Sequence, residues 1–183
     1  MKKRTGYTLI VIGALALLAV ICATVYAYMF RETETKSNLF TPAVISCEVH
    51  EVTDASVTEK TSVTVKNTGN IGAYLRVRLV SYWVRMAEDG TSEIISKPSV
   101  MPEFQMAEGW MAGNDNTYYY KTPVSPDGFT GELLSSTITL IEEDGYQQVI
   151  DIFAEAIQSK PASSVTESWN VQLDANDRIV SVL

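Results

Sequence analysis

The side chains that could perform chemistry are few: one histidine, His50, and two cysteines, Cys22 and Cys47. The zinc-protease motif H-E-x-x-H needs a second histidine, so His50 and Glu51 cannot complete one. A serine–histidine–aspartate triad would have to use His50, and no G-x-S-x-G motif marks a nucleophilic serine. Cys47 and His50 are three residues apart, which places them on opposite faces of a strand. The sequence therefore predicts a protein with no catalytic site and no cofactor.

Three acidic turns could offer oxygen ligands to a calcium ion. They are centred on Asp115, on Asp127 and on residues 142–144. None of them has the twelve-residue spacing of an EF-hand loop. Because acidic side chains usually remain in solvent, we expect these residues to shape turns and expect no metal site.

Trp110, Tyr118 and Tyr120 form a candidate surface for a sugar or a protein partner, because aromatic rings provide large contact areas at binding sites. Alternation along a strand puts Tyr119 on the face opposite Tyr118 and Tyr120. At most two of the three tyrosines can therefore share that surface. Packing in the core or across strands is the alternative, and it is the simpler interpretation.

The net charge of the chain is −8, and it is distributed unevenly. Removal of the positive charges of Lys2, Lys3 and Arg4 would leave −11 on the remainder. An acidic body without a basic cluster lacks the cations needed to bind nucleic acid. It also lacks the charge needed to bind anionic lipid by electrostatic attraction.

A basic N-terminus at residues 2–4 precedes an uninterrupted apolar stretch at residues 9–22, which is the pattern of a signal peptide. Val25 and Ala27 then provide the small-x-small pattern that a signal peptidase recognises. This pattern predicts cleavage between Ala27 and Tyr28, with the signal peptidase as a partner during export.

The alternative is an uncleaved anchor, because residues 6–30 are long enough to span a bilayer. Positive charge stays on the cytoplasmic side in both cases, so the rest of the chain lies outside. We therefore expect three parts: a signal peptide or anchor at 1–27, an extended segment at 28–42 and an exported domain at 43–183. The product is secreted, or remains at the cell surface if it is not cleaved.

From residue 43 onward, apolar residues recur every two positions, which predicts strands. Residues 61–66 and 73–86 flank an Asn-Thr-Gly-Asn turn at 67–70 and predict a β-hairpin. Residues 136–141 predict a further strand.

Alternation on the second strand of this hairpin predicts a core face and an outer face. Leu75, Val77 and Leu79 belong to the core face. Arg76 and Arg78 belong to the outer face, where we expect them to pair with acidic neighbours across the sheet.

The end of the chain predicts one long strand and one short helix. Residues 147–158 alternate well enough to predict a long central strand. After it, Ser163 or Ser164 is expected to cap a short helix that ends near Trp169. Together these patterns predict an all-β, jelly-roll-like antiparallel β-sandwich with an N-terminal signal or transmembrane helix and one short C-terminal helix.

Several segments occur in a specific order along the chain. They are the junction at 27–35, N-L-F-T at 38–41, the run V-K-N-T-G-N-I-G-A-Y-L-R-V-R-L-V at 65–80, D-N-T-Y-Y-Y-K-T-P-V-S-P at 115–126, and A-E-A-I-Q-S at 154–159 before Trp169. In this order they resemble exported proteins of the TasA/camelysin type, which are substrates of a SipW-like signal peptidase in Gram-positive bacteria. The chain departs from that pattern after the junction, where Met29-Phe30-Arg31 replaces the more usual Phe-Thr/Asn-Asp.

The resemblance implies a jelly-roll-like sandwich, secretion and, as in the best-known members, assembly into extracellular matrix fibres of a biofilm. In such fibres an N-terminal strand released by cleavage is donated to the sheet of the next subunit. In this chain the donor would lie in residues 28–41 and would follow ordinary β-augmentation. The apolar side chains of that segment are Tyr28, Met29, Phe30, Leu39 and Phe40.

Two main functions follow as hypotheses. The first is an exported, non-enzymatic structural protein that self-associates into surface or matrix fibres through its N-terminal segment. The second is a membrane-tethered, monomeric binding module that recognises a glycan or a protein. A hydrolase with an unrecognised site is the least favoured alternative.

Overall fold

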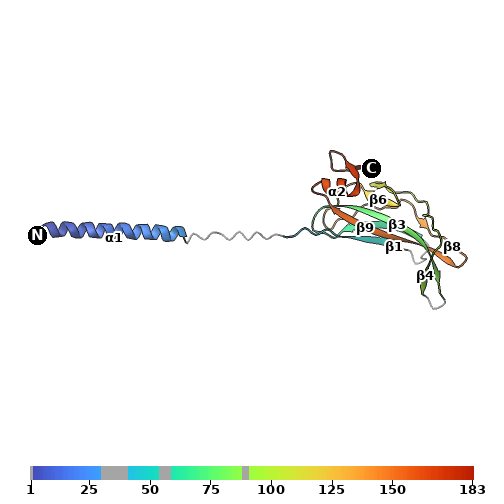
Figure 1. Cartoon of the computed structure of the whole chain (residues 1–183), viewed down its shortest axis with the longest axis horizontal. Helices are drawn as coiled ribbons and strands as arrows, with labels where there is room; N and C mark the ends of the chain where they lie inside the picture. The colour runs from blue at the N-terminus through green and yellow to red at the C-terminus, as the bar shows by residue number, and fades with distance from the viewer. Residues whose placement is uncertain (1, 30–40, 54–58, 88–90) are drawn as a thin grey trace. The chain divides into compact units, whose positions relative to one another are not determined.

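The computed structural model describes residues 2–29, 41–53, 59–87 and 91–183 of the chain (Figure 1). The chain divides into two compact units, Met1–Thr41 and Pro42–Leu183. Among these residues, one helix lies in the first unit, and the strands and a short second helix lie in the second. Each unit is described by itself below.

The helix of the first unit, α1, spans Lys2–Met29. Its 18-residue stretch Val11–Tyr28 has a mean hydropathy of 2.3, and none of that stretch is buried in protein. By length and composition this helix can cross a bilayer, and a signal sequence has the same properties. An N-terminal apolar helix is therefore confirmed.

The helix continues through the predicted cleavage site. Val25, Ala27 and Tyr28 all lie inside α1, which ends at Met29. We predicted an extended chain from Tyr28, so this prediction is wrong for Tyr28 and Met29. No Gly or Pro follows Gly13 in this apolar run, so nothing in its sequence interrupts the helix before Met29. The other predicted donor residues, Phe30, Leu39 and Phe40, lie outside the described residues.

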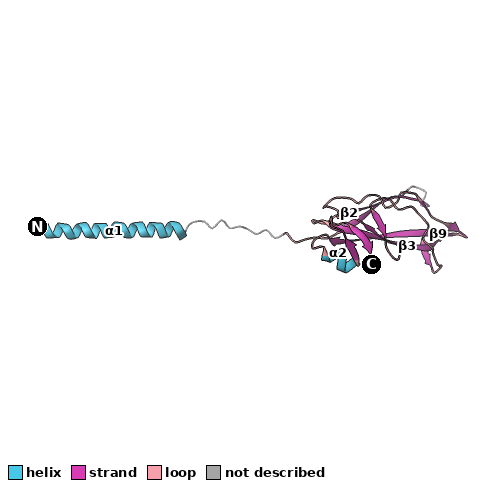
Figure 2. Ribbon diagram, turned by 90° about the horizontal axis from the view of Figure 1, so that it is seen from above, coloured by secondary structure: helices cyan, strands magenta, loops and turns pink. Residues whose placement is uncertain are grey.

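The second unit is built mainly from two antiparallel sheets (Figure 2). The first sheet has the order β1-β2-β7, with β1 at Cys47–Thr53, β2 at Glu59–Asn67 and β7 at Ile138–Thr139. The second has the order β5-β6-β3-β9-β8, and β4 pairs with the end of β3. Its strands are β3 (Ala73–Met86), β4 (Ser92–Ile95), β5 (Trp110–Ala112), β6 (Thr117–Tyr120), β8 (Glu142–Glu143) and β9 (Tyr146–Gln158). The predicted all-β sandwich is confirmed.

The two sheets face each other across one core. Val63 and Val65 of β2 and Leu75, Val77 and Leu79 of β3 are all buried there. The alternation predicted for β3 is therefore confirmed on its core face. On the outer face Arg76 pairs with Glu155 of β9, with 2.6 Å between Nη2 and the carboxylate oxygen.

The predicted hairpin between β2 and β3 is wrong. The two strands follow each other in the chain, but β2 pairs with β1 and β7, and β3 pairs with β9, β6 and β4. The turn between them carries the chain from one sheet to the other, because each strand has an apolar stripe that must face the same core. Asn67, which is fully buried, supports this crossing by donating its side-chain N–H groups to the carbonyls of Ile71 and Val124.

The predicted long strand is confirmed as β9, which pairs with β3 from Ala73↔Gln158 to Arg85↔Tyr146. It is not the central strand, because β3 has neighbours on both sides whereas β9 pairs on its far side only with the short β8. The strand predicted at 136–141 is shorter than expected and is reduced to β7.

A helix and a hairpin at the end of the chain cover one end of the outer face of β3. Helix α2 spans Ser163–Trp169, and strands β10 (Val171–Leu173) and β11 (Ile179–Val182) form the hairpin. With Tyr74 and Tyr119 they form a second apolar cluster. The helix ends at Trp169 as predicted, but no serine caps it, because Ala162 occupies the N-cap position without a side-chain hydrogen bond.

Gly69 should tolerate no side chain. A Cβ at this position would lie far inside the van der Waals radius of the Val44 carbonyl oxygen, which is a backbone atom and cannot move away alone. We expect Gly69→Ala to lower the free energy of unfolding by about 1–3 kcal/mol, as for other overpacked sites. Urea unfolding would measure this change. Gly131→Ala is the control, because its nearest neighbour would be at an ordinary 3.7 Å; equal effects at both sites would contradict the prediction.

Candidate functional site

His50 lies on the solvent side of β1, as alternation predicted. It is exposed, its Nε2 is 3.9 Å from a carboxylate oxygen of Glu48, and its ring meets the ring of Phe129 edge-on at 5.2 Å. Cys47 belongs to the opposite, half-buried face and packs against the core. The structure therefore does not bring these two side chains together into a thiol–imidazole pair.

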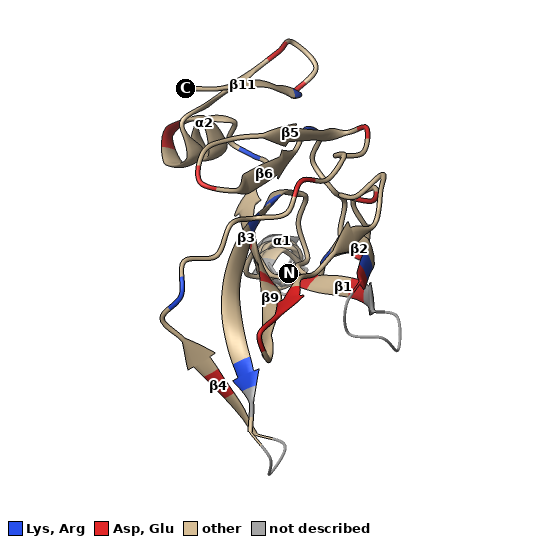
Figure 3. Ribbon diagram, turned by 90° about the vertical axis from the view of Figure 1, so that its right-hand side faces the viewer, with Lys and Arg blue, Asp and Glu red and all other residues tan. Residues whose placement is uncertain are grey.

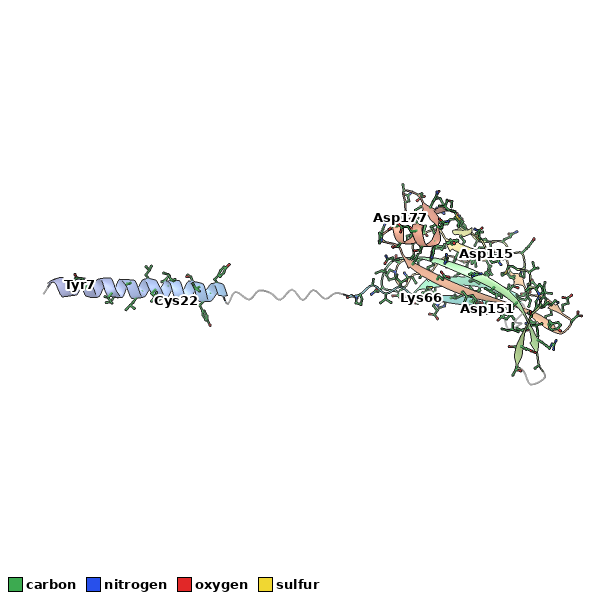
Figure 4. The ribbon with its side chains drawn as sticks, viewed as in Figure 1. Tyr7, Cys22, Lys66, Asp115, Asp151 and Asp177 are labelled. Atoms are coloured by element: carbon green, nitrogen blue, oxygen red, sulfur yellow. The ribbon has the colours of Figure 1, made fainter. Side chains whose placement is uncertain are left out.

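The acidic turns contain residues whose backbone adopts the left-handed conformation that a tight turn requires. Asp115, Asn116, Asp127 and Asp144 all have positive φ angles between 53° and 59°, a conformation that Asp and Asn adopt more readily than most residues. Asp127 also forms an ion pair with Lys66, with 3.1 Å between carboxylate oxygen and Nζ (Figure 4 labels Lys66 and Asp115). Within the described part of the chain, no three His, Cys, Asp or Glu side chains gather as a metal ion would require.

The aromatic residues proposed as a ligand surface belong mainly to the core, so that prediction is wrong for Trp110. Its side chain is 1% exposed and donates its indole N–H to the Gly131 carbonyl at 3.0 Å. Tyr120 packs edge-on against Trp110 at 5.2 Å, and Tyr118 is half-buried against Phe104. The indole of Trp110 is therefore not available to a ligand, whereas Tyr118 and Tyr120 remain partly exposed.

The long strand β9 has a free edge. Near one end of β9, the Ser159 N–H donates to the Gly72 carbonyl, which continues β3. Near the other end, the Gln148 N–H donates to the Ile141 carbonyl on the side of β9 that faces away from β3. Residues of an antiparallel strand alternate in the side to which their backbone groups point. Ile150, Ile152 and Ala154 therefore point their N–H and C=O groups away from β3, and so does Ala156.

The short strand β8 pairs only with Tyr146 and Gln147 of β9. Among the described residues, the backbone groups of these four residues have no hydrogen-bond partner. The row is about 20 Å long at the usual rise of a strand. Unpaired backbone donors and acceptors along an edge form a template for another strand. Each of the four residues offers one donor and one acceptor.

The strand β1 presents a second free edge towards β9. Ser46 accepts a hydrogen bond from Thr68 N–H in the ladder with β2. By alternation, the backbone groups of Cys47, Val49 and Glu51 point away from β2. Strand β1 lies next to β9, as Figures 1 and 3 show, but within the described residues no backbone hydrogen bond joins the two strands. We call this interval between β1 and β9 the seam.

The seam is apolar towards the core, and towards solvent β9 presents Asp151, Phe153 and Glu155. Cys47 and Val49 of β1, and Ile152 and Ala154 of β9, are only partly buried although they pack against the core. The pKa of the Cys47 thiol is raised, first by burial and second by the negative charge of Glu155. Because β1 and β9 lie side by side, the Glu155 carboxylate on β9 acts on the thiol at the start of β1.

Comparison with known proteins returns nothing: no family model, no curated protein and no solved structure matches the chain. The seam must therefore be interpreted from its own geometry.

Sequence reasoning missed the seam. Residues 150–156 were predicted as strand, but alternation in a single strand does not reveal which edge remains unpaired. The only local signal is the pair of small residues Ala154 and Ala156, which break a run of larger apolar side chains in β9.

The reactivity of Cys47 should report on the seam. Because burial and Glu155 both raise its pKa, the thiolate that reacts with iodoacetamide should form only above the ordinary midpoint of about 8.5. We expect the alkylation rate of the Cys22→Ser protein, whose one thiol is Cys47, to rise through a midpoint above that value. The Cys47→Ser protein is the control for Cys22. A midpoint at or below that of a free peptide thiol would contradict the burial of Cys47.

Proposed function

We propose that the chain is an exported, non-enzymatic structural protein whose copies join when the N-terminal segment of one pairs with the seam of the next. The observation that carries this proposal is the row of backbone groups at residues 150, 152, 154 and 156, which have no partner within the described residues and are flanked by partly buried apolar side chains of the core. A soluble monomer usually covers or charges such an edge. A strand added to β9 would satisfy these groups, but it would have to displace β1, whose Cα atoms lie within 8 Å of β9, because neighbouring strands are about 4.8 Å apart.

The length of the chain before the body fits this role. Residues 28–41 comprise 14 residues, and a strand matching residues 150–156 needs only seven. The remaining residues would connect two bodies. Each backbone hydrogen bond gained would contribute about 0.5–1.5 kcal/mol net, and apolar side chains of the segment, such as Leu39 and Phe40, would add specificity by filling pockets.

Export supplies the location for this assembly. The helix α1, which begins with the basic residues 2–4, suits either a signal peptide or an anchor, and both place the body outside. By its resemblance to TasA/camelysin-type proteins, we place the chain at the surface or in the matrix of a Gram-positive bacterium. The same resemblance proposes a SipW-like peptidase that cleaves after Ala27.

Electron microscopy tests the proposal directly. A protein that starts at Tyr28 should form filaments, because it has both the segment and the seam. A protein that starts at Pro42 should remain monomeric, because it has the seam alone. Dispersed monomers from both proteins over a wide range of concentration would refute assembly through this segment.

A proline on the free edge of β9 should block assembly without unfolding the body. Ala154→Pro removes an N–H group that points away from β3, so the β3–β9 ladder keeps its hydrogen bonds. We expect loss of filaments by electron microscopy. Ala154→Ser is the matched control, because it keeps the N–H group at a small side chain and should assemble. A folded Ala154→Pro protein, verified by circular dichroism, that still assembled normally would exclude this edge.

A tethered binding module is the second candidate, and a surface pocket supports it. The pocket has a volume of about 440 Å³ and is lined mainly by apolar side chains, including Met101, Phe104, Met106 and Tyr118. This volume lies within the range of small-molecule sites. Retention of α1 in the mature protein, measured by intact mass, together with a monomeric state would favour this function over assembly.

A further inference from the structure

A cleft lies beside β3, between the two shorter strands that pair with the same edge. Strand β6 pairs with β3 as far as Arg78, and β4 pairs with it from Trp83 onward. The interval of β3 between these pairings lines a hollow of about 440 Å³. Met101 and Asn116 line both this hollow and the apolar pocket described above, so the two adjoin. We call the two hollows together the β3 cleft.

The body holds both walls of the cleft in place. One wall is the turn that carries Asp115 and Asn116, and the Leu79 N–H attaches this turn to β3 by donating to the Asn116 carbonyl at 3.0 Å. The other wall contains Ser99, whose hydroxyl accepts a hydrogen bond at 3.0 Å from the side-chain nitrogen of Gln148. Gln148 is fully buried. Walls that are already ordered lower the entropic cost of binding a ligand.

Two charged side chains that line the cleft have no partner within the part of the chain that the structure describes. We predicted an acidic partner for Arg78, but its neighbour on β9 is Phe153 and its guanidinium forms no ion pair or hydrogen bond there. That prediction is wrong for Arg78, whereas Arg76 pairs with Glu155. The carboxylate of Asp115 likewise has no partner among these residues. The cleft therefore offers a ligand one group that only donates and one that only accepts hydrogen bonds.

The adjoining pocket adds an aromatic surface to these polar groups. Phe104 and Tyr118 line it with their ring centroids 5.4 Å apart, and both side chains remain partly exposed. An aromatic ring presents a large apolar face, on which the C–H groups of a sugar ring can pack. An apolar surface beside a few polar groups that fix orientation is the usual composition of a small-ligand site.

The charges of the cleft favour a neutral ligand with many hydroxyl groups. Arg78 and Asp115 line one hollow, and Glu103 lines the other. An anionic ligand would be repelled by the two carboxylates, and a cationic ligand by the guanidinium. A hydroxyl group both donates and accepts, so it can bind a guanidinium and a carboxylate equally.

We propose that the β3 cleft binds a neutral oligosaccharide, whose hydroxyl groups accept from Arg78 and donate to Asp115 while one sugar ring packs on Tyr118. The proposal rests on the second candidate function and deepens it by naming the class of ligand. It is independent of assembly, because neither the seam nor residues 28–41 take part.

The test uses the full chain in nanodiscs of phosphatidylcholine, a lipid without net charge. The protein is applied to an array of neutral, anionic and cationic oligosaccharides, and the dissociation constant of the best neutral one is measured by calorimetry. We expect Arg78→Ala to weaken binding about tenfold or more, because it removes hydrogen bonds from a charged donor. Arg178→Ala is the matched control and should bind normally, because Arg178 is exposed and lines neither hollow.

Two variants of Asp115 separate hydrogen bonding from charge. Glycine and asparagine both tolerate its positive φ angle. Asp115→Gly removes the acceptor and should weaken binding about tenfold, whereas Asp115→Asn keeps an acceptor oxygen and should weaken it by no more than about threefold. Raising the salt concentration from about 20 mM to about 500 mM should change the affinity less than about twofold, because salt does not screen a neutral ligand.

The outcomes separate the ligand class from the functions proposed above. If no neutral oligosaccharide binds, or if Arg78→Ala and Arg178→Ala bind equally well, the proposal is overturned. Binding of anionic oligosaccharides alone, lost in Arg78→Ala and at high salt, would keep a binding module but overturn this ligand class. Phenylalanine, a zwitterion with an aromatic ring, is titrated in parallel, and its binding in place of any neutral oligosaccharide would have the same meaning. The presence or absence of filaments affects none of these results.

Discussion

The antiparallel ladder between β3 and β9 is the constraint on which the second unit depends. It runs from Ala73↔Gln158 to Arg85↔Tyr146 and joins parts of the chain that are far apart in sequence. Because backbone groups alternate along a strand, the same ladder that satisfies half of β9 directs the other half to its far edge. Because side chains alternate as well, it turns Leu75 and Val77 towards the core and Arg76 towards Glu155 outside.

The two sheets enclose the core unequally. On one side, backbone bonds from Thr130 to Val65 and from Leu133 to Val63 attach a long loop to β2 and close the sandwich. On the other side, β1 and β9 lie next to each other without pairing, within the described residues. The open side is where the core has partly buried apolar residues, so backbone pairing and hydrophobic burial would both favour an added strand at that place.

One short turn connects these features. Asn67 holds the crossing from β2 to β3, Gly69 allows the close approach of Val44, and Asn70 binds the chain that enters β1. The turn thus separates the two strands into different sheets and also binds the residues that lead into β1.

The sequence by itself determined the features that depend on neighbouring residues. The apolar run of α1, the alternation on β3 and β9 and the helix ending at Trp169 all follow from local periodicity and composition, which need no tertiary information. Only the tertiary structure decided the partner of β3, the burial of Trp110 and the free edge of β9. Pairing depends on contacts between distant residues, here for example Arg76 with Glu155, and many registers satisfy the same alternation. The candidate site consists of unpaired backbone groups, and every residue type except proline has the same ones, so side chains such as those of Ala154 and Ala156 gave only a weak signal of it.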